Sequence, residues 1–194
     1  IIVGPYSPFY FAAGVGNEYE AGQCFFEARG YKAIAHPISM KASLNPLQVP
    51  EWLASVDLSQ EGIEISSWRP EMTAELLRFA TEAFAPDWAR FVREAVEDIV
   101  GGGDPRRLMV ARDGRRVVGF SHYSSERFGP IGVDPEYRGK SIGQVLCRET
   151  MAAQQEAGAR ESWFLWSNHQ TAKRLYDGFG FKVWREFKLY EKEL

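Results

Sequence analysis

A short run of glycines and cations, from Arg138 to Gly143, stands between an expected strand and an expected helix. Apolar residues from Ile131 to Val133 indicate the strand, and helical spacing of apolar residues begins at Ile142. The first N–H groups of a helix lack intrahelical partners and lie at the positive end of the helix dipole. A turn with little side-chain bulk at that place binds phosphate, and Lys140 adds positive charge. The segment therefore predicts a site for a ligand that carries a pyrophosphate.

Two widespread phosphate-binding turns do not fit these letters. Gly139-Lys140-Ser141 match the end of a P-loop, but the earlier glycine that a P-loop needs would stand at Asp134. A Rossmann fingerprint needs glycine at positions 139, 141 and 144, where this chain has glycine, serine and glutamine. An ordinary tight turn between strand and helix remains the alternative to a phosphate site.

The remaining pattern is R/Q-x-x-G-x-G/A after a strand that ends in V-x-P, and it resembles the GCN5-related N-acetyltransferase (GNAT) family. In that family this turn holds the pyrophosphate of acetyl-CoA. Arg138 and Gly143 match the pattern, and Ser141 stands where the family usually has its first glycine. Ser141 and Gln144 form a capping-box signature, so we expect Ser141 to cap the helix while neighbouring N–H groups stay free. The alternative is that its side chain crowds the phosphate.

A second segment, residues 162–182, resembles the later half of the same family. An apolar strand from Trp163 to Trp166 precedes Asn168, which is suited to cap the following helix. Tyr176 lies on the apolar face of that helix, and Gly178 or Gly180 ends it. Two motifs in the right order are more specific than either alone, and the resemblance covers about residues 62 to 194.

The expected elements from Ile63 onward follow the order β-α-α-β-β-β-α-β-α-β-β, with Asp113-Gly114 as a hairpin turn and two closing strands near 182–184 and 187–191. This order matches the GNAT (acyl-CoA N-acyltransferase) fold, an α/β architecture in which a mixed sheet is flanked by helices. Residues 59–194 are therefore predicted to form a complete GNAT acetyltransferase domain.

Residues 1–58 are predicted to be a partial GNAT-like unit and a linker, which runs from about Leu44 to Gly62. The segment from Cys24 to Lys32 is similar to the one that ends at Lys182 when the two are aligned with an offset of 150 residues. Phe26 then stands opposite Tyr176. We interpret the chain as part of a tandem-GNAT protein whose N-terminal unit is incomplete and catalytically silent; coincidence is the alternative. The expected assembly is a monomer with pseudo-dimeric repeats or a homodimer.

The resemblance implies a set of acetyl-CoA contacts. The amide of Val133 would bond the thioester carbonyl or the pantetheine, the amides of the turn would hold the pyrophosphate, and Asn168 would contact the pantetheine arm. Lys173 could approach a phosphate of coenzyme A, although a solvated helix face is the alternative for it. The cofactor-binding residues expected in this way are Ile131, Val133, Arg138, Gly139, Lys140, Ser141, Ile142, Gly143, Asn168 and Lys173.

Three residues are candidates for catalysis. The resemblance implies that Tyr176 protonates the leaving thiolate, since a tyrosine hydroxyl stays protonated at neutral pH; core packing is the alternative. Glu126 lies just before an expected strand, where the family often places a carboxylate base, and His122 has an ordinary pKa suited to the same task. A solvated loop carboxylate and a packed strand histidine are the alternatives for these two.

The composition is that of an ordinary globular protein: 194 residues, 45% hydrophobic, with a net charge of −3. It does not favour nucleic acid as a partner. Two cysteines and three histidines show no metal or disulfide spacing, so we expect no metal and a reduced, cytoplasmic setting. The apolar start of the chain is interrupted by glycine and proline, which does not suit a membrane-spanning helix.

Together these features predict an acetyl-CoA-dependent N-acetyltransferase that acts on the primary amine of a small molecule by direct attack. The alternatives are a catalytically weak acetyl-CoA-binding regulatory module and a peptide or protein N-acetyltransferase. We expect the acceptor pocket to be formed near residues 83–88 and 123–128. Aromatic side chains in both segments, including Phe84 and Tyr123, suggest that it is partly apolar.

Overall fold

The computed structural model describes residues 1–4, 12–84 and 86–193. Packing divides the chain into two compact units. Unit 1 comprises Ile1–Ala42, Trp163–Asp177 and Phe181–Leu194, and unit 2 comprises Ser43–Ser162 and Gly178–Gly180. The domain boundary predicted after residue 58 rests on a similarity between two sequence segments, and a division of the structure by packing does not test it.

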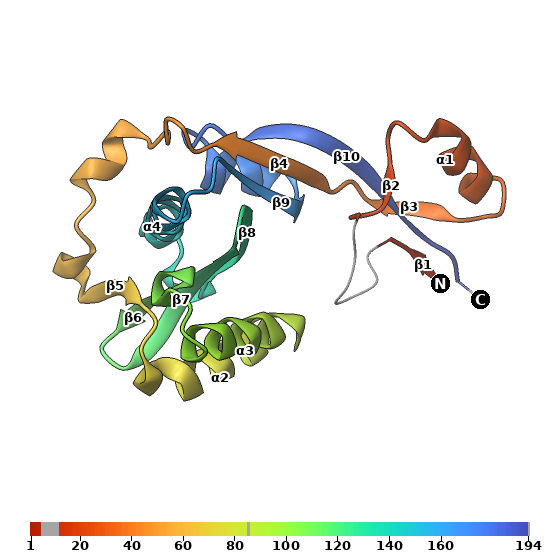
Figure 1. The fold of residues 1–194 in the computed structure, drawn as a ribbon. Coiled ribbons are helices and arrows are strands. Elements are labelled where there is room, and N and C mark those ends of the chain that lie inside the picture. Colours follow the sequence, from red (N-terminus) through yellow and green to blue (C-terminus); the bar gives the residue numbers. More distant parts are fainter. Residues whose placement is uncertain (5–11, 85, 194) are drawn as a thin grey trace. The chain divides into compact units, whose positions relative to one another are not determined.

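Unit 2 is built on four antiparallel strands in chain order (Figure 1): β5 (Ile63–Ser67), β6 (Leu108–Asp113), β7 (Arg116–Ser124) and β8 (Arg127–Val133). The predicted hairpin at Asp113-Gly114 is confirmed, because β6 ends at Asp113 and Gly114 has a φ of 57°. Glycine adopts this left-handed conformation without the cost that a side chain brings. The strands predicted in this part of the chain are therefore all present.

Three helices cover the two faces of this sheet: α2 (Thr73–Ala83), α3 (Pro86–Val100) and α4 (Ile142–Glu156). Figure 1 shows α2 and α3 on one face and α4 on the other. The apolar stripes of α2 and α3 bury Leu76, Phe79 and Val92 against Phe120 of β7. None of the described helices combines the length and the apolar composition needed to cross a membrane.

The segment predicted as a linker is packed rather than free. It contains two short helical turns, η1 (Glu51–Ser55) and η2 (Leu58–Glu61), and buries Leu44 and Leu53 completely. Side chains of α4 bind its backbone: Gln155 Nε2 donates to the carbonyl of Leu44 at 2.6 Å, and Arg148 Nη1 donates to that of Leu53 at 3.4 Å. Residues 44–62 are therefore a structural part of unit 2.

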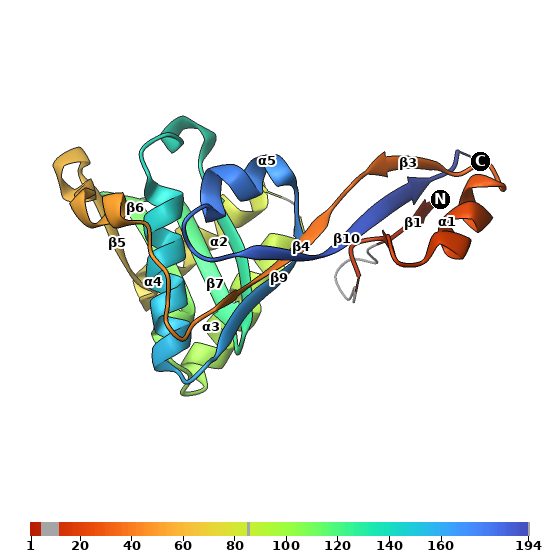
Figure 2. The ribbon, with the colours of Figure 1, turned by 90° about the horizontal axis from the view of Figure 1, so that it is seen from above.

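Unit 1 combines segments from both ends of the sequence. It contains β1 (Ile2–Val3), β2 (Val15–Gly16), α1 (Glu20–Glu27), β3 (Lys32–Ala35), β4 (Ile38–Ser43), β9 (Glu161–Ser167), α5 (His169–Thr171), the π-helical turn η6 (Ala172–Tyr176) and β10 (Lys182–Glu191). Strand β4 lies between β9 and β10, and the hydroxyl of Ser39 donates to the carbonyl of Leu165 at 2.8 Å. Figure 2 shows β3 running beside the later half of β10.

The prediction of two closing strands is wrong, because residues 182–191 form the single strand β10. Its first half pairs with β4 and its second half with β3, and a register shift interrupts each pairing. A bulge bends a strand without ending it. The sequence break that suggested two strands therefore marks a bulge, with Trp184 on the exposed side.

Candidate active site

The segment before the predicted phosphate turn is held rigidly by Asp134. Its backbone N–H donates to Val118 O at 2.9 Å, and its carboxylate accepts from the N–H of Glu136 at 2.9 Å and from Arg116 Nη2 at 2.8 Å. The contact between the Asp134 carboxylate and the N–H of Glu136 caps the short helical turn η5 (Pro135–Tyr137). The chain therefore leaves β8 in a fixed direction, and the turn that follows begins at a defined place.

The turn itself uses two left-handed residues. Gly139 has a φ of 86° and Ser141 a φ of 62°. The first helical hydrogen bond of α4 runs from the N–H of Val145 to the carbonyl of Ser141 at 3.0 Å. Left-handed residues alternating with others turn successive N–H groups toward one side and form a concave anion site. The geometry therefore agrees with the predicted phosphate turn.

The prediction that Ser141 caps α4 is wrong, since its side chain makes no capping hydrogen bond. A capping serine has an extended backbone that aims its hydroxyl at the N–H groups of the first helical turn. The left-handed backbone of Ser141 aims its side chain elsewhere. Serine here occupies a conformation that glycine adopts most readily, which explains the glycine of the usual family pattern.

The two cations of the turn differ in their surroundings. Lys140 Nζ lies 2.6 Å from a carboxylate oxygen of Glu61, and this hydrogen bond raises the lysine pKa. Arg138 is exposed and has no ion pair within the described part of the chain. A Cβ placed on Gly139 would meet no atom within 4 Å, so the backbone beside it is open to a ligand. An open backbone beside a free guanidinium fits a diphosphate.

The remaining expected cofactor residues of unit 2 lie on either side of this turn. Val133 and Ile131 are half-buried on β8, where they pair with Gly119 and Ser121 of β7. Ile142 is buried in the core, so only its backbone could contact a ligand. Strand, turn and helix thus bring together eight of the predicted residues: Ile131, Val133, Arg138, Gly139, Lys140, Ser141, Ile142 and Gly143.

Three predicted residues belong to unit 1. Asn168 caps α5 as expected, its Oδ1 accepting from the N–H of Thr171 at 2.8 Å. Lys173 is exposed on the π-helical turn that follows. Tyr176 ends this turn and is buried, with its ring centroid 4.6 Å from that of Phe164 and 5.1 Å from that of Phe181. Its aromatic packing is thus confirmed, and a π-helical turn often marks a functional position.

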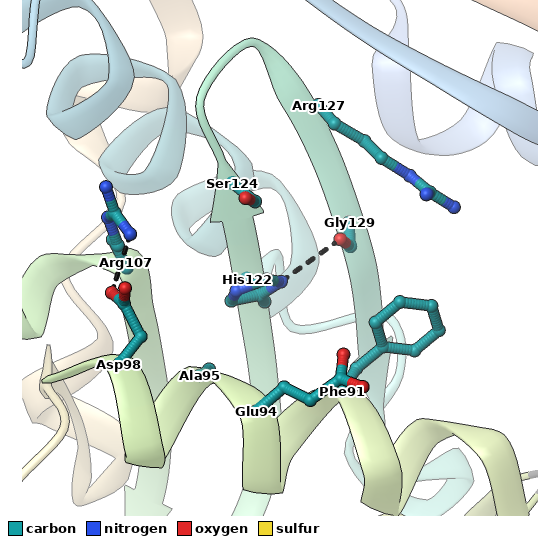
Figure 3. Close-up of a pocket in the computed structure, with 9 residues that line it drawn as sticks. All are labelled: Phe91, Glu94, Ala95, Asp98, Arg107, His122, Ser124, Arg127 and Gly129. Atoms are coloured by element: carbon teal, nitrogen blue, oxygen red, sulfur yellow. Dashed lines mark hydrogen bonds and ion pairs between the residues drawn. The ribbon is translucent and has the colours of Figure 1, made fainter. Parts of the chain in front are cut away.

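His122 lies in a pocket of about 270 Å³ between α3 and the hairpin of β7 and β8 (Figure 3). Burial lowers the pKa of His122 from 6.5 to about 4, so the ring is neutral at physiological pH. Its Nδ1 lies 3.4 Å from the carbonyl oxygen of Gly129, which places the single ring proton on Nδ1. Nε2 has no hydrogen-bond partner among the described residues and is then the basic nitrogen.

The other candidate base, Glu126, does not line this pocket. Its carboxylate is half-buried at the tip of the hairpin and accepts from the N–H groups of Arg160 and Glu161 at 3.3 and 3.4 Å. Both backbone N–H groups donate to the same carboxylate oxygen, Oε1. The structure therefore gives Glu126 a structural contact and gives His122 the access to a pocket.

Sequence reasoning missed most of the pocket, which is lined by Phe91, Glu94, Ala95, Asp98, Arg107, His122, Ser124, Arg127 and Gly129. Phe91, Glu94 and Asp98 follow one another at helical spacing, and this signal could have identified the face of α3. The expected aromatic lining is wrong for two residues, because Tyr123 and Phe128 are buried in the core. Phe84 stacks on Trp88 with a centroid distance of 4.3 Å, while residue 85 of the expected segment lies outside the described residues.

Comparisons with known proteins agree with this geometry. Residues 104–183 match the family model of the acetyltransferase (GNAT) domain, which begins before β6 and ends within β10. No curated protein sequence matches the chain. Among the described residues, no three His, Cys, Asp or Glu side chains gather as a metal site requires.

Several solved structures have the same fold. One is a GCN5-related glucosamine N-acetyltransferase region of a fungal multi-domain β-N-acetylglucosaminidase, with 23% identity, a TM-score of 0.78, and coverage of 98% of this chain and 25% of that protein. A GCN5-related N-acetyltransferase from Sphaerobacter thermophilus has 20% identity and a TM-score of 0.68 over 92% of this chain and 58% of its own. A tandem GNAT protein of the clavulanic acid pathway has 15% identity and a TM-score of 0.56 over 98% of this chain and 61% of its own.

The family match and these neighbours support the presence of a GNAT acetyltransferase domain in this chain. The chain has the α/β GNAT fold, in which a mixed sheet is flanked by helices. The chain spans only 25% and 58% of the length of the first two neighbours. Identity below one quarter shows the fold alone, and a shared fold does not identify the acceptor.

Proposed function

We propose that this chain transfers the acetyl group of acetyl-CoA to the primary amine of a small molecule by direct attack. One observation carries the proposal: left-handed Gly139 and Ser141 open the backbone at the start of α4, directly after Val133 ends β8. This turn lies inside the stretch that matches the acetyltransferase domain. Acetyl-CoA would supply the acetyl group, whose thioester carbonyl carbon is susceptible to attack by an amine.

The proposed roles of the turn are binding and positioning. The amides of residues 138–143 and the guanidinium of Arg138 would hold the pyrophosphate, and the amide of Val133 would bond the thioester carbonyl or the pantetheine. Holding both reactants in one geometry removes much of the entropic barrier to a reaction between two molecules. No nucleophilic side chain of the protein is needed for such direct transfer.

The reaction requires two proton movements. The amine nitrogen forms a bond to the acetyl carbon while the carbon–sulfur bond breaks; the amine loses a proton, and coenzyme A leaves as the thiol. We assign His122 to the first movement, because its Nε2 has no partner among the described residues and the ring lines a pocket. With a pKa of about 4 it is a weak base, so the proton would pass on through water.

The second proton movement is assigned to Tyr176 by family resemblance. Its position at the end of a π-helical turn in unit 1 is consistent with a functional hydroxyl. Glu126 is the less favoured base, since two backbone N–H groups share its oxygen. Asn168 and Lys173 are proposed to contact the pantetheine arm and a phosphate of coenzyme A.

We also propose that residues 1–58 contain the closing part of a second GNAT unit, which ends before the segment predicted as a linker at about Leu44. The pairing of β10 with β4 and its pairing with β3 are related by the 150-residue offset. Val183 pairs with Met40, and Ala33 pairs with Tyr190. Residue 183 follows residue 33 by 150 positions, and residue 190 follows residue 40 by the same number. The same offset relates Lys182–Lys41 to Lys32–Glu191, and Arg185–Ser39 to Ala35–Leu189.

Further features of unit 1 follow the same offset. Gly30 and Gly180 both have positive φ, at 81° and 74°. The ring centroids of Phe26 and Tyr31 lie 5.4 Å apart, and those of Tyr176 and Phe181, 150 residues later, lie 5.1 Å apart. Two bulges, at Ile34 and Trp184, also correspond. These repeated contacts support a tandem origin, with Phe26 in place of the tyrosine.

Thiol release with a thiol reagent, combined with mass spectrometry of the amine product, tests the proposed reaction. The chain should release coenzyme A from acetyl-CoA only when an amine is present and should add one acetyl group to that amine. Glucosamine belongs in the acceptor panel because the fungal neighbour's region is described as a glucosamine N-acetyltransferase. Acetyl-CoA binding without transfer to any amine would favour a regulatory module, and activity on peptides alone would favour a peptide N-acetyltransferase.

A further inference from the structure

The carboxylates of the His122 pocket are already balanced by cations. Glu94 Oε1 lies 2.8 Å from Arg90 Nη1, and Asp98 Oδ2 lies 2.6 Å from Arg107 Nη1. Figure 3 shows Glu94 and Asp98 along α3, with Arg107 beside Asp98. The pocket therefore holds two paired acidic groups, and neither is a free charge.

Arg127 is the exception among the charged side chains of the pocket. Within the described residues it has neither an ion pair nor a hydrogen bond, and its guanidinium carbon lies 5.7 Å from the ring centroid of Phe91. Figure 3 places Arg127 above Phe91, on the side of the pocket formed by β8. A half-buried guanidinium that rests on an aromatic ring and has no anion is suited to bind one from a ligand.

The hairpin that carries Arg127 is fixed in place. Arg127 pairs with Ser124 across the end of β7 and β8, and the side-chain amide of Gln154 donates to the carbonyl of Ser125 at 3.0 Å. The tip is therefore tied to α4, and Arg127 projects from a rigid element. Such positioning lowers the entropic cost of binding a ligand.

We propose that this pocket binds an acceptor that carries an anionic group as well as the primary amine, with Arg127 pairing with the anion and His122 Nε2 facing the amine. The proposal rests on the proposed acetyl transfer and names its substrate class: a small amino acid or a phosphorylated amine. A volume of about 270 Å³ is at the small end of ligand pockets, which suits a metabolite of this size.

Anion binding also has a consequence for the base. Burial contributes most to the low pKa of His122, and the charges of Arg107 and Arg127 lower it further while Asp98 raises it. Of the charged groups around the ring, Glu94 and Asp98 on α3 and Arg107 are already paired. An acceptor anion beside Arg127 would offset an unpaired positive charge and raise the pKa of His122, so the correct acceptor would strengthen its own base.

Matched acceptor pairs test the proposal by activity. Glucosamine 6-phosphate is compared with glucosamine, and glycine with glycinamide. The members of the first pair differ by a phosphate and those of the second by a carboxylate, so the two pairs show which anion the pocket prefers. The anionic member of at least one pair should have the higher kcat/KM, and Arg127→Gln should lower that value by about 10- to 100-fold. Arg127→Lys should retain part of the preference. Arg115→Gln removes the same charge at the opposite end of β7 and should change nothing.

A binding measurement keeps the proposal separate from the proposed function. The imidazole signals of His122 are followed by NMR over a pH range, with and without glycine or glucosamine 6-phosphate. The anionic ligand should move the titration of His122 to higher pH in the wild type and not in Arg127→Gln, even if no amine is acetylated. Equal use of neutral and anionic acceptors, equal loss of both in Arg127→Gln, or an unmoved His122 titration would overturn the proposal.

Discussion

Replacing Ser141 with glycine should stabilise the protein, because Ser141 has a left-handed backbone with a φ of 62°. A residue with a Cβ loses about 1–2 kcal/mol in this conformation. Glycine removes that cost but loses about 0.5–1 kcal/mol through its greater freedom in the unfolded chain. The net gain is about 0.5–1 kcal/mol, which corresponds to about 1–4 °C in Tm for a chain of this size.

Ser125 offers a matched control, since it is the other described non-glycine residue with a positive φ, at 54°. It lies in the β7–β8 turn and is not among the proposed cofactor contacts. Ser125→Gly and Ser141→Gly should raise the Tm by similar amounts in thermal unfolding followed by circular dichroism. A stabilised Ser125→Gly beside an unchanged or destabilised Ser141→Gly would refute the left-handed geometry of the phosphate turn.

The same variant separates strain from phosphate contact. Strain at Ser141 is present with and without acetyl-CoA, so its relief cancels from the binding affinity. If only the backbone of residue 141 contacts the pyrophosphate, Ser141→Gly should bind acetyl-CoA within about threefold of the wild type, a change of less than about 1 kcal/mol. Binding that becomes at least tenfold tighter would show instead that the serine side chain crowds the phosphate.

Three further predictions concern other parts of the chain. The pKa of His122 falls from 6.5 to about 4 on folding. Between these two pH values the unfolded chain binds a proton that the folded chain does not, so the free energy of unfolding should fall by up to about 3 kcal/mol as the pH drops from 6.5 to 4. Denaturant titrations should show a flatter pH dependence for His122→Gln. Tyr176→Phe should lower kcat at least tenfold in thiol-release kinetics with unchanged acetyl-CoA affinity. Gly178→Ala should cost about 2 kcal/mol, because φ is 81° and a Cβ would lie 2.6 Å from Pro50 Cγ.

Each of these predictions has a control. Exposed His36 can be changed to glutamine, and the pH dependence should then keep its slope. Unchanged kcat in Tyr176→Phe would leave the tyrosine with core packing alone. Gly158 also has a positive φ, at 90°, but a Cβ there meets nothing within 4 Å, so Gly158→Ala should cost less than Gly178→Ala. Equal losses would contradict the close approach of Pro50.

The sequence was sufficient where local chemistry and periodicity determine structure. The hairpin at Asp113-Gly114, the amphipathic helices α2 to α4 and the cap formed by Asn168 all follow from short-range rules. The cap predicted for Ser141 failed because two interactions compete for one residue. The letters S-x-x-Q favour a cap, whereas the turn requires a left-handed backbone, and the turn prevails.

Long-range pairing limited the rest of the prediction. Strand β10 pairs with both β3 and β4, with one bulge at Ile34 of β3 and one at Trp184 of β10. Nothing in residues 182–191 alone reveals these partners. The pocket around His122 unites α3 with the end of the β7–β8 hairpin, so its charged lining becomes visible only in three dimensions. Tyr123 and Phe128 were expected in the acceptor pocket because they lie in the segment 123–128, but both are buried in the core. The hydroxyl of Tyr123 lies near the carbonyl of Ala153 on α4, not in the pocket beside α3.

The central claim is that the turn from Arg138 to Gly143 binds the pyrophosphate of acetyl-CoA, and calorimetric titration tests it most directly. Acetyl-CoA should bind in the micromolar range, and 3′-dephospho-coenzyme A, which keeps the pyrophosphate, should retain most of the affinity. S-acetylpantetheine, which has no phosphate, should bind at least about 100-fold more weakly. Equal binding of all three ligands, or no binding of acetyl-CoA, would contradict the assignment of this turn.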